Sequence, residues 1–217
     1  MHKINIVTLF PQVFEKFLEL IPYKNLIKNG TLQINIINLR DFGMGNYNKV
    51  DDKPYGGGPG MVLMIEPIFN ALQTVESTSN HKILLSPRGK RYTQQRATEL
   101  KNLNEITLIC GRYEGVDARV EEMCDELISV GDFVLAGGEV AALCVMESVL
   151  RLCEGALGDS ESILDESFTQ SDHNQIEYPQ YTRPEEFNGK KVPQELLSGN
   201  HKLIAQWRSN NKLPKQN

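Results

Sequence analysis

The sequence predicts an α/β protein with a mostly parallel sheet that helices cover on both faces. Short apolar runs alternate with helix-like segments along the chain, which is the order that produces parallel strands and crossover helices. Three of the runs, HKILLS, ITLICG and ELISVG, are apolar enough to be buried strands. Apolar residues make up 40% and charged residues 24% of the 217 residues, as is typical of a soluble globular protein.

The first part of the chain begins with a strand over residues 3–9. Pro11 then opens a helix, because proline is tolerated in the first turn of a helix. Gly30 ends a second short helix, and the alternation of residues 32–38 predicts another strand. Residues 41–60 hold six glycines and two prolines, so we expect no regular structure there.

From there to residue 152 the chain alternates between helices and strands. Thr93 is a typical N-cap, since its side chain can accept a hydrogen bond from the first turn of a helix. The strands of this part are the three apolar runs named above. The predicted helices cover residues 67–75, 93–101, 117–123 and 139–152, and the last of them is amphipathic.

The end of the chain differs in composition from the part before it. Residues 158–178 are polar and lack a clear period, which predicts a linker. The net charge of the chain is −5, yet residues 181–217 carry seven Lys or Arg and only three Glu. An acidic body therefore precedes a basic tail piece, in which residues 201–209 predict a helix. Solvated surface is an alternative interpretation of this tail and of a second basic cluster, Arg88, Lys90, Arg91 and Arg96.

The sequence favours a cytoplasmic protein without a membrane span. It has no run of about 18 apolar residues, the length that crosses a bilayer. Asn5 interrupts the first apolar run and Pro11 ends it, which is not typical of a signal peptide. The four cysteines form no CxxC pair and lie in apolar segments, so free thiols in a reducing compartment are favoured over a zinc site.

The glycine-rich stretch VDDKPYGGGPGM, residues 50–61, first suggests a phosphate-binding loop. A Walker loop requires Lys-Ser or Lys-Thr after its last glycine, but Met-Val-Leu follows Gly60. A dinucleotide fingerprint would lie between the first strand and its helix, where LFPQVF has no glycine. The two aspartates of the stretch would also repel a phosphate. Both phosphate-binding interpretations fail, and a flexible surface loop remains an alternative.

Proline or glycine directly follows each of the three apolar strands. The turns are LLSPRGK, LICGRYEGVD and ISVGDFVLAGGEVAA. The carboxyl ends of strands in an open α/β sheet are where ligands bind, and glycine allows the backbone to approach a ligand closely. Main-chain groups at such turns can bind a planar heterocycle such as adenine. The three turns together predict a ligand pocket.

These motifs identify a resemblance. In order, VDDKPYGGGPGM, LSPRG, CGRYEGVDARV, SVGDFVLAGGE, YPQYTRP and LLSGNH resemble the bacterial tRNA (guanine-N1)-methyltransferases of the TrmD type. The match runs from LFPQVF to QWR. The family belongs to the SPOUT class, so the resemblance implies a deep trefoil knot. It implies a knotted cofactor-binding domain over residues 1–157, a flexible linker over 158–178 that carries the catalytic carboxylate, and a short basic helical tRNA-binding domain over 179–217.

The resemblance also implies a cofactor and a substrate loop. S-adenosylmethionine would lie in the knot, with its adenine bound by main-chain groups. The implied cofactor residues are Pro87, Gly111, Tyr113, Glu114, Val130, Gly131, Asp132, Phe133, Val134, Leu135, Gly137 and Gly138. The glycine-rich stretch would lie beside the incoming nucleotide through Asp51, Asp52, Gly58, Pro59 and Gly60, and one of the two aspartates would bind the neighbouring guanosine.

The implied reaction is methylation of guanosine at tRNA position 37, beside the anticodon. Guanine N1 must lose its proton before it can attack, which a positioned carboxylate can assist. A cation near the exocyclic oxygen can stabilise the charge that develops. By resemblance Arg151 is this cation. The family's proton acceptor is usually an Asp directly before Ser-Phe or Ser-His. Glu166 occupies that position here and Asp165 precedes it, so either carboxylate could take the role.

The resemblance further implies a homodimer with its active site at the interface, the tRNA anticodon stem-loop as partner, and a possible dependence on magnesium. Two alternatives stay open. One is another SPOUT methyltransferase that acts on ribosomal RNA or on a different tRNA site. The other is a non-catalytic RNA-binding dimer, which two departures from the family pattern allow. These departures are Glu166, and a chain that stops soon after QWRSNN where relatives usually continue.

Overall fold

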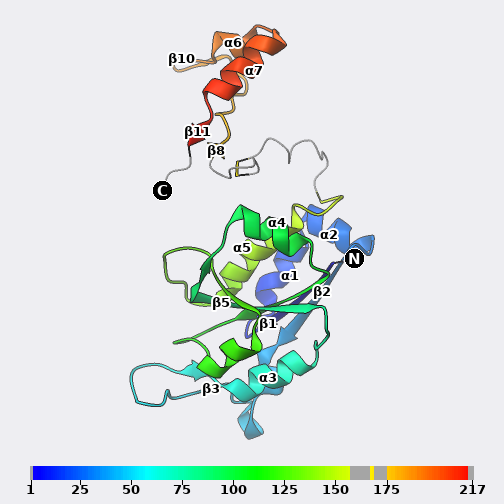
Figure 1. Ribbon diagram of the computed structural model, residues 1–217, viewed down its shortest axis with the longest axis vertical. Helices are drawn as coiled ribbons and strands as arrows, with labels where there is room; N and C mark the ends of the chain where they lie inside the picture. The colour runs from blue at the N-terminus through cyan, green and yellow to red at the C-terminus, as the bar shows by residue number, and fades with distance from the viewer. Residues whose placement is uncertain (1, 157–166, 169–174, 215–217) are drawn as a thin grey trace. The chain divides into compact units, whose positions relative to one another are not determined.

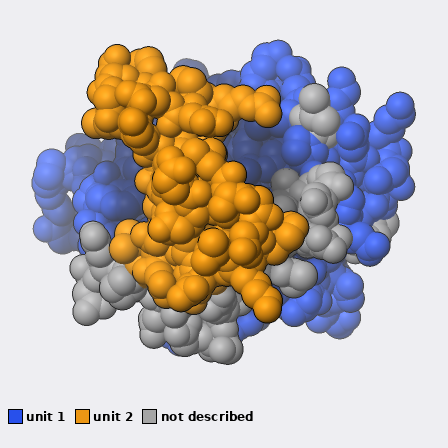
Figure 2. Space-filling model, turned by 90° about the horizontal axis from the view of Figure 1, so that it is seen from above, with its two compact units in different colours: residues 1–158 blue, residues 159–217 orange. Residues whose placement is uncertain are grey.

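The computed structural model describes residues 2–156, 167–168 and 175–214. The chain divides into two compact units, Met1–Gly158 and Asp159–Asn217, which Figure 2 colours separately. The first unit holds the sheet and most of the helices. The second is small, and its described residues form short strands and two helices.

The first unit is built on a five-stranded sheet in which every described pairing is parallel. Its order is β2-β1-β6-β5-β7. The strands are β1 (His2–Thr8), β2 (Leu32–Asn38), β5 (Asn80–Arg91), β6 (Glu105–Cys110) and β7 (Glu126–Ser129). All six residues of the central strand β6 are buried, as expected for a parallel sheet covered on both faces. The predicted fold class is confirmed.

Helices cover the two faces of this sheet unequally (Figure 1). On one face lie α1 (Gln12–Leu18), α2 (Ile21–Lys28), α4 (Gln94–Lys101) and α5 (Gly138–Leu150). The opposite face carries α3 (Ile65–Gln73) and the 3-10 helices η1 (Leu39–Phe42) and η3 (Ala118–Met123). Thr93 caps α4 as predicted, because its hydroxyl accepts a hydrogen bond from the Arg96 N–H. Asp117 caps η3 in the same way through the Arg119 N–H.

Two segments differ from the sequence prediction, because residues that the local pattern does not mark as strand still pair with a neighbouring strand. β5 does not stop at Ser86 but continues to Arg91, and Leu85 and Lys90 both pair with Ile128 of β7. Residues 86–89 therefore leave the sheet and return to it. Residues 41–60, for which no regular structure was expected, contain η2 (Gly45–Tyr47) and the two-residue strand β3 (Asp51–Asp52).

Two helices also differ from their predicted form. α3 begins at Ile65 rather than Pro67, since proline fits anywhere in the first turn, where backbone N–H groups have no partner within the helix. α5 is only weakly amphipathic. Eight of its residues are buried, and its exposed side includes Val140, which is 53% accessible.

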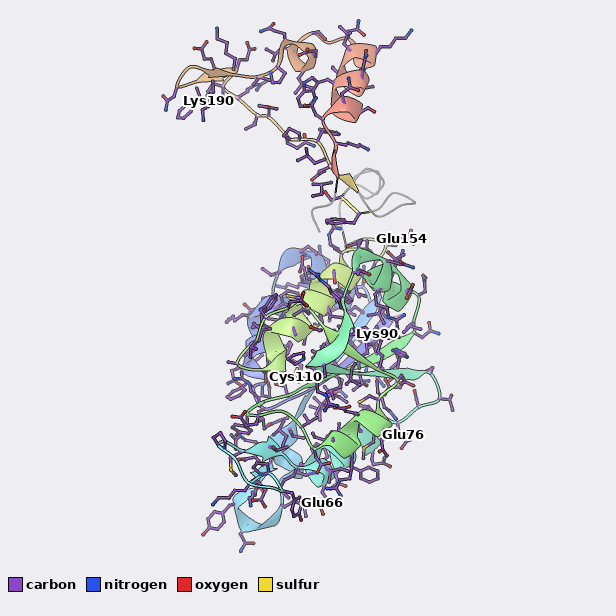
Figure 3. The ribbon with its side chains drawn as sticks, turned by 60° about the vertical axis from the view of Figure 1, so that its left-hand side comes forward. Glu66, Glu76, Lys90, Cys110, Glu154 and Lys190 are labelled. Carbon is purple, nitrogen blue, oxygen red and sulfur yellow. The ribbon has the colours of Figure 1, made fainter. Side chains whose placement is uncertain are left out.

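The second unit has a small core of aromatic side chains. Tyr178 and Tyr181 both contact Trp207 edge to face, and the Arg208 guanidinium lies over the Tyr178 ring. Trp207 belongs to α7 (His201–Asn210), which confirms the helix predicted there. The other elements are β8 (Gln175–Ile176), β9 (Glu186–Phe187), β10 (Lys190–Lys191), α6 (Gln194–Leu197) and β11 (Leu213–Pro214). The β9–β10 hairpin carries Lys190, labelled in Figure 3.

An ion-paired cluster joins α4 to the edge of the large sheet. Glu126 of β7 accepts hydrogen bonds from Arg96 Nε at 3.1 Å and is 2.9 Å from His81 Nε2. Burial alone would raise the pKa of Glu126, but the hydrogen bonds from Arg96 and His81 outweigh it and lower this pKa below 4.5. Because the folded pKa is depressed, the paired carboxylate stabilises the fold above about pH 4.5, and this stabilisation is lost as pH falls through the folded pKa.

We expect Glu126→Gln to lower the free energy of unfolding at pH 7 by about 1–2 kcal/mol, because it removes a charged acceptor from a partly buried pair. Urea unfolding at pH 7 and at pH 3.5 measures the effect, and the difference from wild type should shrink at the lower pH. Glu19→Gln, which breaks an exposed pair with Lys16, is the matched control with no expected change. An equal loss at both pH values would contradict the assignment.

Candidate functional site

The three turns predicted to form a pocket meet at the carboxyl edge of the sheet. They enclose a cavity of about 370 Å³, between residues 84–88, the loop after β6 and the segment from β7 to the start of α5. This is the expected location for a ligand in an α/β sheet, and the volume is in the range of small-molecule sites. Eleven of the twelve residues implied for the cofactor line it. Asp132 does not, and instead faces Arg91 at 3.6 Å.

Close backbone packing sets the floor of this cavity. The Gly138 N–H donates to the Gly111 carbonyl at 2.8 Å, which joins the first residue of α5 to the end of β6. A Cβ at Gly138 would lie 2.7 Å from the Cα of Cys110, the last residue of β6, which is labelled in Figure 3. A Cβ at Gly111, by contrast, would meet only Val116 and Leu85, at 3.6 and 3.7 Å. Gly138 therefore serves helix–strand packing, whereas Gly111 leaves space on the cavity wall.

A partly buried ion pair lies at this wall, and its arginine, Arg112, also lines the cavity. Arg112 Nε donates to Glu139 Oε2 at 2.9 Å, and Arg112 Nη1 donates to the Ala136 carbonyl at 3.2 Å. The second oxygen of Glu139 accepts from the Thr8 hydroxyl at 2.9 Å. Glu139 is only 1% exposed, so its charge is stabilised by these two partners. The Arg112 guanidinium also lies 4.4 Å from the centre of the Phe10 ring.

The sequence analysis missed Arg112 and Glu139. Both directly follow a glycine at the edge of the predicted pocket, in CGRYEG and AGGEV. A charged residue at such a junction, between a buried strand and a buried helix, needs a partner of opposite charge. The opposite charges of Arg112 and Glu139 could therefore have indicated the ion pair, because the two turns that carry them were already predicted to meet.

The loop after β6 is joined to the glycine-rich stretch by main-chain hydrogen bonds. The Glu114 N–H donates to the Met61 carbonyl at 2.9 Å, and the Leu63 N–H donates to the Gly115 carbonyl at 3.0 Å. Tyr113 has a φ of +60°, an uncommon conformation for a residue with a side chain, and its ring lines the cavity. Backbone strain of this kind is often found at functional sites. The glycine-rich stretch therefore ends at the cavity wall.

The residues implied to bind substrate lie along this stretch. Asp51 pairs with Leu63 of β4 (Val62–Leu63), and Asp52 is exposed and faces Lys49 at 2.8 Å. The hydrogen bond from Lys49 is the main reason why the pKa of Asp52 is lowered. The exposed Gly58–Pro59–Gly60 segment follows. Gly60 has a φ of +81°, a backbone conformation that residues with a side chain rarely adopt, which explains glycine at that position.

A second ion pair crosses the edge of the cavity. Arg88, from the segment that leaves β5, contacts Glu121 of η3 at 2.9 Å, and both residues line the cavity. The basic cluster noted in the sequence is thus largely neutralised, since Arg88, Arg91 and Arg96 each face a carboxylate. This favours the interpretation of the cluster as ordinary surface.

Of the three residues implied for catalysis, the structure describes one, Arg151. Arg151 is the C-cap of α5 and is partly buried, and it is not among the residues that line the cavity. Glu166 and Asp165 lie outside the described residues. Within the described ranges, no group of three or more His, Cys, Asp or Glu gathers that could hold a metal ion. In the same part of the chain, none of the helices combines the length and apolar character that crossing a bilayer requires.

We expect Gly138→Ala to destabilise the protein by about 1–3 kcal/mol, because its Cβ would displace the backbone of β6. Gly111→Ala, with ordinary contact distances, should unfold like wild type and is the matched control. Thermal unfolding followed by circular dichroism measures both. Equal melting temperatures for wild type and Gly138→Ala would show that α5 does not pack this closely on β6.

Comparison with known proteins identifies the family of this chain. Residues 2–217 match the family model described as tRNA (Guanine-1)-methyltransferase TrmD. A tRNA (guanine-N(1)-)-methyltransferase of Caldanaerobacter subterraneus is 50% identical over 205 residues, which is 94% of this chain and 84% of the relative. Proteins of the same description from Sulfurihydrogenibium and Clostridium perfringens are 49% and 47% identical, covering 97% and 95% of this chain and 83% and 86% of the relatives. The chain belongs to the TrmD family of tRNA (guanine-1)-methyltransferases.

Proposed function

We propose that this protein transfers a methyl group from S-adenosylmethionine to N1 of guanosine at position 37 of tRNA. Family membership supports the tRNA guanine-N1 methyltransferase activity. The observation that carries the proposal is the cavity at the carboxyl edge of the sheet, where three glycine-containing turns meet. The glycine-rich stretch is hydrogen-bonded to the same wall, so a bound cofactor and an incoming nucleotide could share one site.

The cavity suits S-adenosylmethionine in size and chemistry. When bound, this cofactor supplies a methyl group on a positively charged sulfur, which needs placement but no activation. Buried Leu85 and Ile128 offer apolar walls for an adenine ring, and the turns from Pro87 to Gly138 offer main-chain donors and acceptors. Gly111 lines the cavity without a side chain, so a ligand there meets no side-chain atoms from this residue. As part of the proposal, these turns form the trefoil knot of the SPOUT class.

The reaction requires the N1 proton of guanine to leave. We assign this proton to a carboxylate, Glu166 in preference to Asp165, from the resemblance of LDESF to the family motif. Arg151 would hold the negative charge that develops on the exocyclic oxygen when N1 loses its proton. Asp51 or Asp52 would accept a hydrogen bond from the base of the neighbouring guanosine at position 36.

Exposed apolar side chains beside the cavity support a homodimer. Phe133 and Val134 are 56% and 87% exposed, and Val140 is exposed on α5 a few residues further on. Apolar residues grouped in this way are typical of an interface. The basic residues of the second unit, among them Lys190, Lys191 and Lys202, are the proposed contacts with the tRNA phosphates. A cytoplasmic location follows from the tRNA substrate.

We expect a tRNA transcript with guanosines at positions 36 and 37 to become methylated when S-adenosylmethionine is present. A transcript changed at position 37 should not react, because N1 of that guanine is the proposed nucleophile. Mass spectrometry of digested tRNA identifies 1-methylguanosine and its position. Methylation elsewhere in tRNA, or of ribosomal RNA only, would contradict the site assignment. Asp51→Ala tests the contact with the neighbouring guanosine, because this variant should have a weaker preference for guanosine at position 36.

Two further variants separate chemistry from cofactor binding. Glu166→Gln should lose nearly all turnover while it binds S-adenosylhomocysteine as wild type does, since its carboxylate acts only on the guanine proton. If Asp165→Asn is the inactive variant instead, the proton acceptor is Asp165. Gly111→Ala should weaken S-adenosylhomocysteine binding at least about tenfold in calorimetry, because its Cβ fills the cavity wall. Unchanged affinity would place the cofactor elsewhere.

We expect the protein to be a dimer in multi-angle light scattering, because apolar side chains border the cavity. Val140→Lys should shift the equilibrium toward monomers, since it places a charge on the proposed interface. Glu76→Lys is the control, because it introduces the same side chain at an exposed residue outside the proposed interface. A monomeric wild type that retains full methylation activity would refute the shared site.

A further inference from the structure

A buried tyrosine hydroxyl joins α2 to α5. The Tyr23 side chain is only 3% exposed, and its ring stacks on Phe17 with 4.7 Å between the ring centres. The hydroxyl donates a hydrogen bond to the carboxylate of Glu147 on α5. The ring is therefore held by stacking, and the hydroxyl has a single charged acceptor within the described contacts.

Glu147 lies one helical turn before Arg151. The Arg151 N–H donates to the Glu147 carbonyl at 3.1 Å, which shows that α5 is still helical between them. Side chains four residues apart lie on the same face of a helix, and an acid that precedes a base by four residues is the favourable order. The carboxylate that Tyr23 holds is thus on the face from which Arg151 projects.

Burial and the two charges on α5 act on the Tyr23 hydroxyl in opposite directions. Burial is the largest cause that raises the pKa of the Tyr23 hydroxyl, and Glu147 raises it further, while the positive charge of Arg151 lowers it. The net shift is upward, so the hydroxyl stays protonated and remains a hydrogen-bond donor at neutral pH. Tyr23, Glu147 and Arg151 therefore form one electrostatic cluster across α2 and α5.

A second tyrosine shows what a purely structural contact to α5 looks like. Tyr92, whose pKa burial raises to about 12, makes a 2.7 Å hydrogen bond between its hydroxyl and the Ser148 hydroxyl. This contact also ties a tyrosine to α5, at the residue next to Glu147, but its partner is neutral. A neutral partner is thus enough to attach a tyrosine to α5. A carboxylate has a further use, because it can orient a guanidinium through charge-assisted hydrogen bonds.

We propose that Tyr23 and Glu147 are positioning residues that hold the Arg151 guanidinium in the orientation needed at the guanine oxygen. The inference rests on the proposed function, in which Arg151 contacts that oxygen. Arginine has a long and flexible side chain, so a fixed carboxylate one turn away limits the positions of its guanidinium. Tyr23 in turn fixes the carboxylate, which is otherwise on an exposed residue.

The test compares Tyr23→Phe and Glu147→Gln with Tyr92→Phe. We expect the first two to lower kcat for guanosine-37 methylation about 10- to 100-fold, because small displacements of a catalytic group are costly. The KM for tRNA and the affinity for S-adenosylhomocysteine by calorimetry should stay within about twofold of wild type. Tyr92→Phe should keep the wild-type kcat, and melting temperatures separate loss of rate from loss of fold.

A double-mutant cycle with Arg151→Lys shows whether the residues act together. If Tyr23 acts through Arg151, adding Tyr23→Phe to Arg151→Lys should lower kcat much less than it does in wild type. An undiminished loss in that background, or a Tyr23→Phe variant as active as Tyr92→Phe, would overturn the inference while the proposed function stands. An Arg151→Lys variant with wild-type kcat would overturn the assigned role of Arg151 and the inference with it.

Discussion

The candidate site depends on the ion pair between the partly buried Arg112 and the buried Glu139. It connects the loop after β6 with the first turn of α5, and through the Thr8 hydroxyl it also reaches the end of β1. A buried charge without its partner costs about 3–5 kcal/mol, so removal of Arg112 would leave the buried Glu139 carboxylate strongly destabilised. Because Arg112 also binds the Ala136 carbonyl, the same side chain holds the segment that forms the far wall of the cavity. Three chain segments that are distant in sequence are thereby kept at one edge of the sheet.

Around this ion pair, backbone contacts hold the segments of the site together. Gly138 packs against β6, and the glycine-rich stretch is hydrogen-bonded to the loop at Glu114 and Gly115. Main-chain groups have little freedom to rearrange, so such a cavity suits a rigid planar ligand. The same construction couples the cavity to the glycine-rich stretch, where Asp51 and Asp52 lie. The main-chain hydrogen bonds therefore hold the cavity and the glycine-rich stretch in a fixed relation to each other.

Charge separates the two units in a way that fits an RNA partner. In the first unit, Arg88, Arg91 and Arg96 each face a carboxylate, so this cluster contributes little free positive charge. The basic residues of the second unit include Lys190 and Lys202, and its core is the small cluster of Trp207 with two tyrosines. Phosphate contacts are strong only when lysine or arginine is available to replace counterions, which favours the second unit as the electrostatic contact with RNA.

By itself the sequence determined most elements of the large sheet, because short apolar runs between glycine, proline and capping residues leave few alternatives. The cap at Thr93, the buried strand β6 and the meeting of three turns were all predictable from local pattern. The extension of β5 to Arg91 was not, because residues 86–89 read as an ordinary turn and only pairing with β7 continues the strand. The tertiary structure alone decided which polar side chains meet. Arg112 and Glu139 are 27 residues apart and Tyr23 and Glu147 are 124 apart, and no spacing rule connects such pairs, since the sheet and its helices bring them together only after folding.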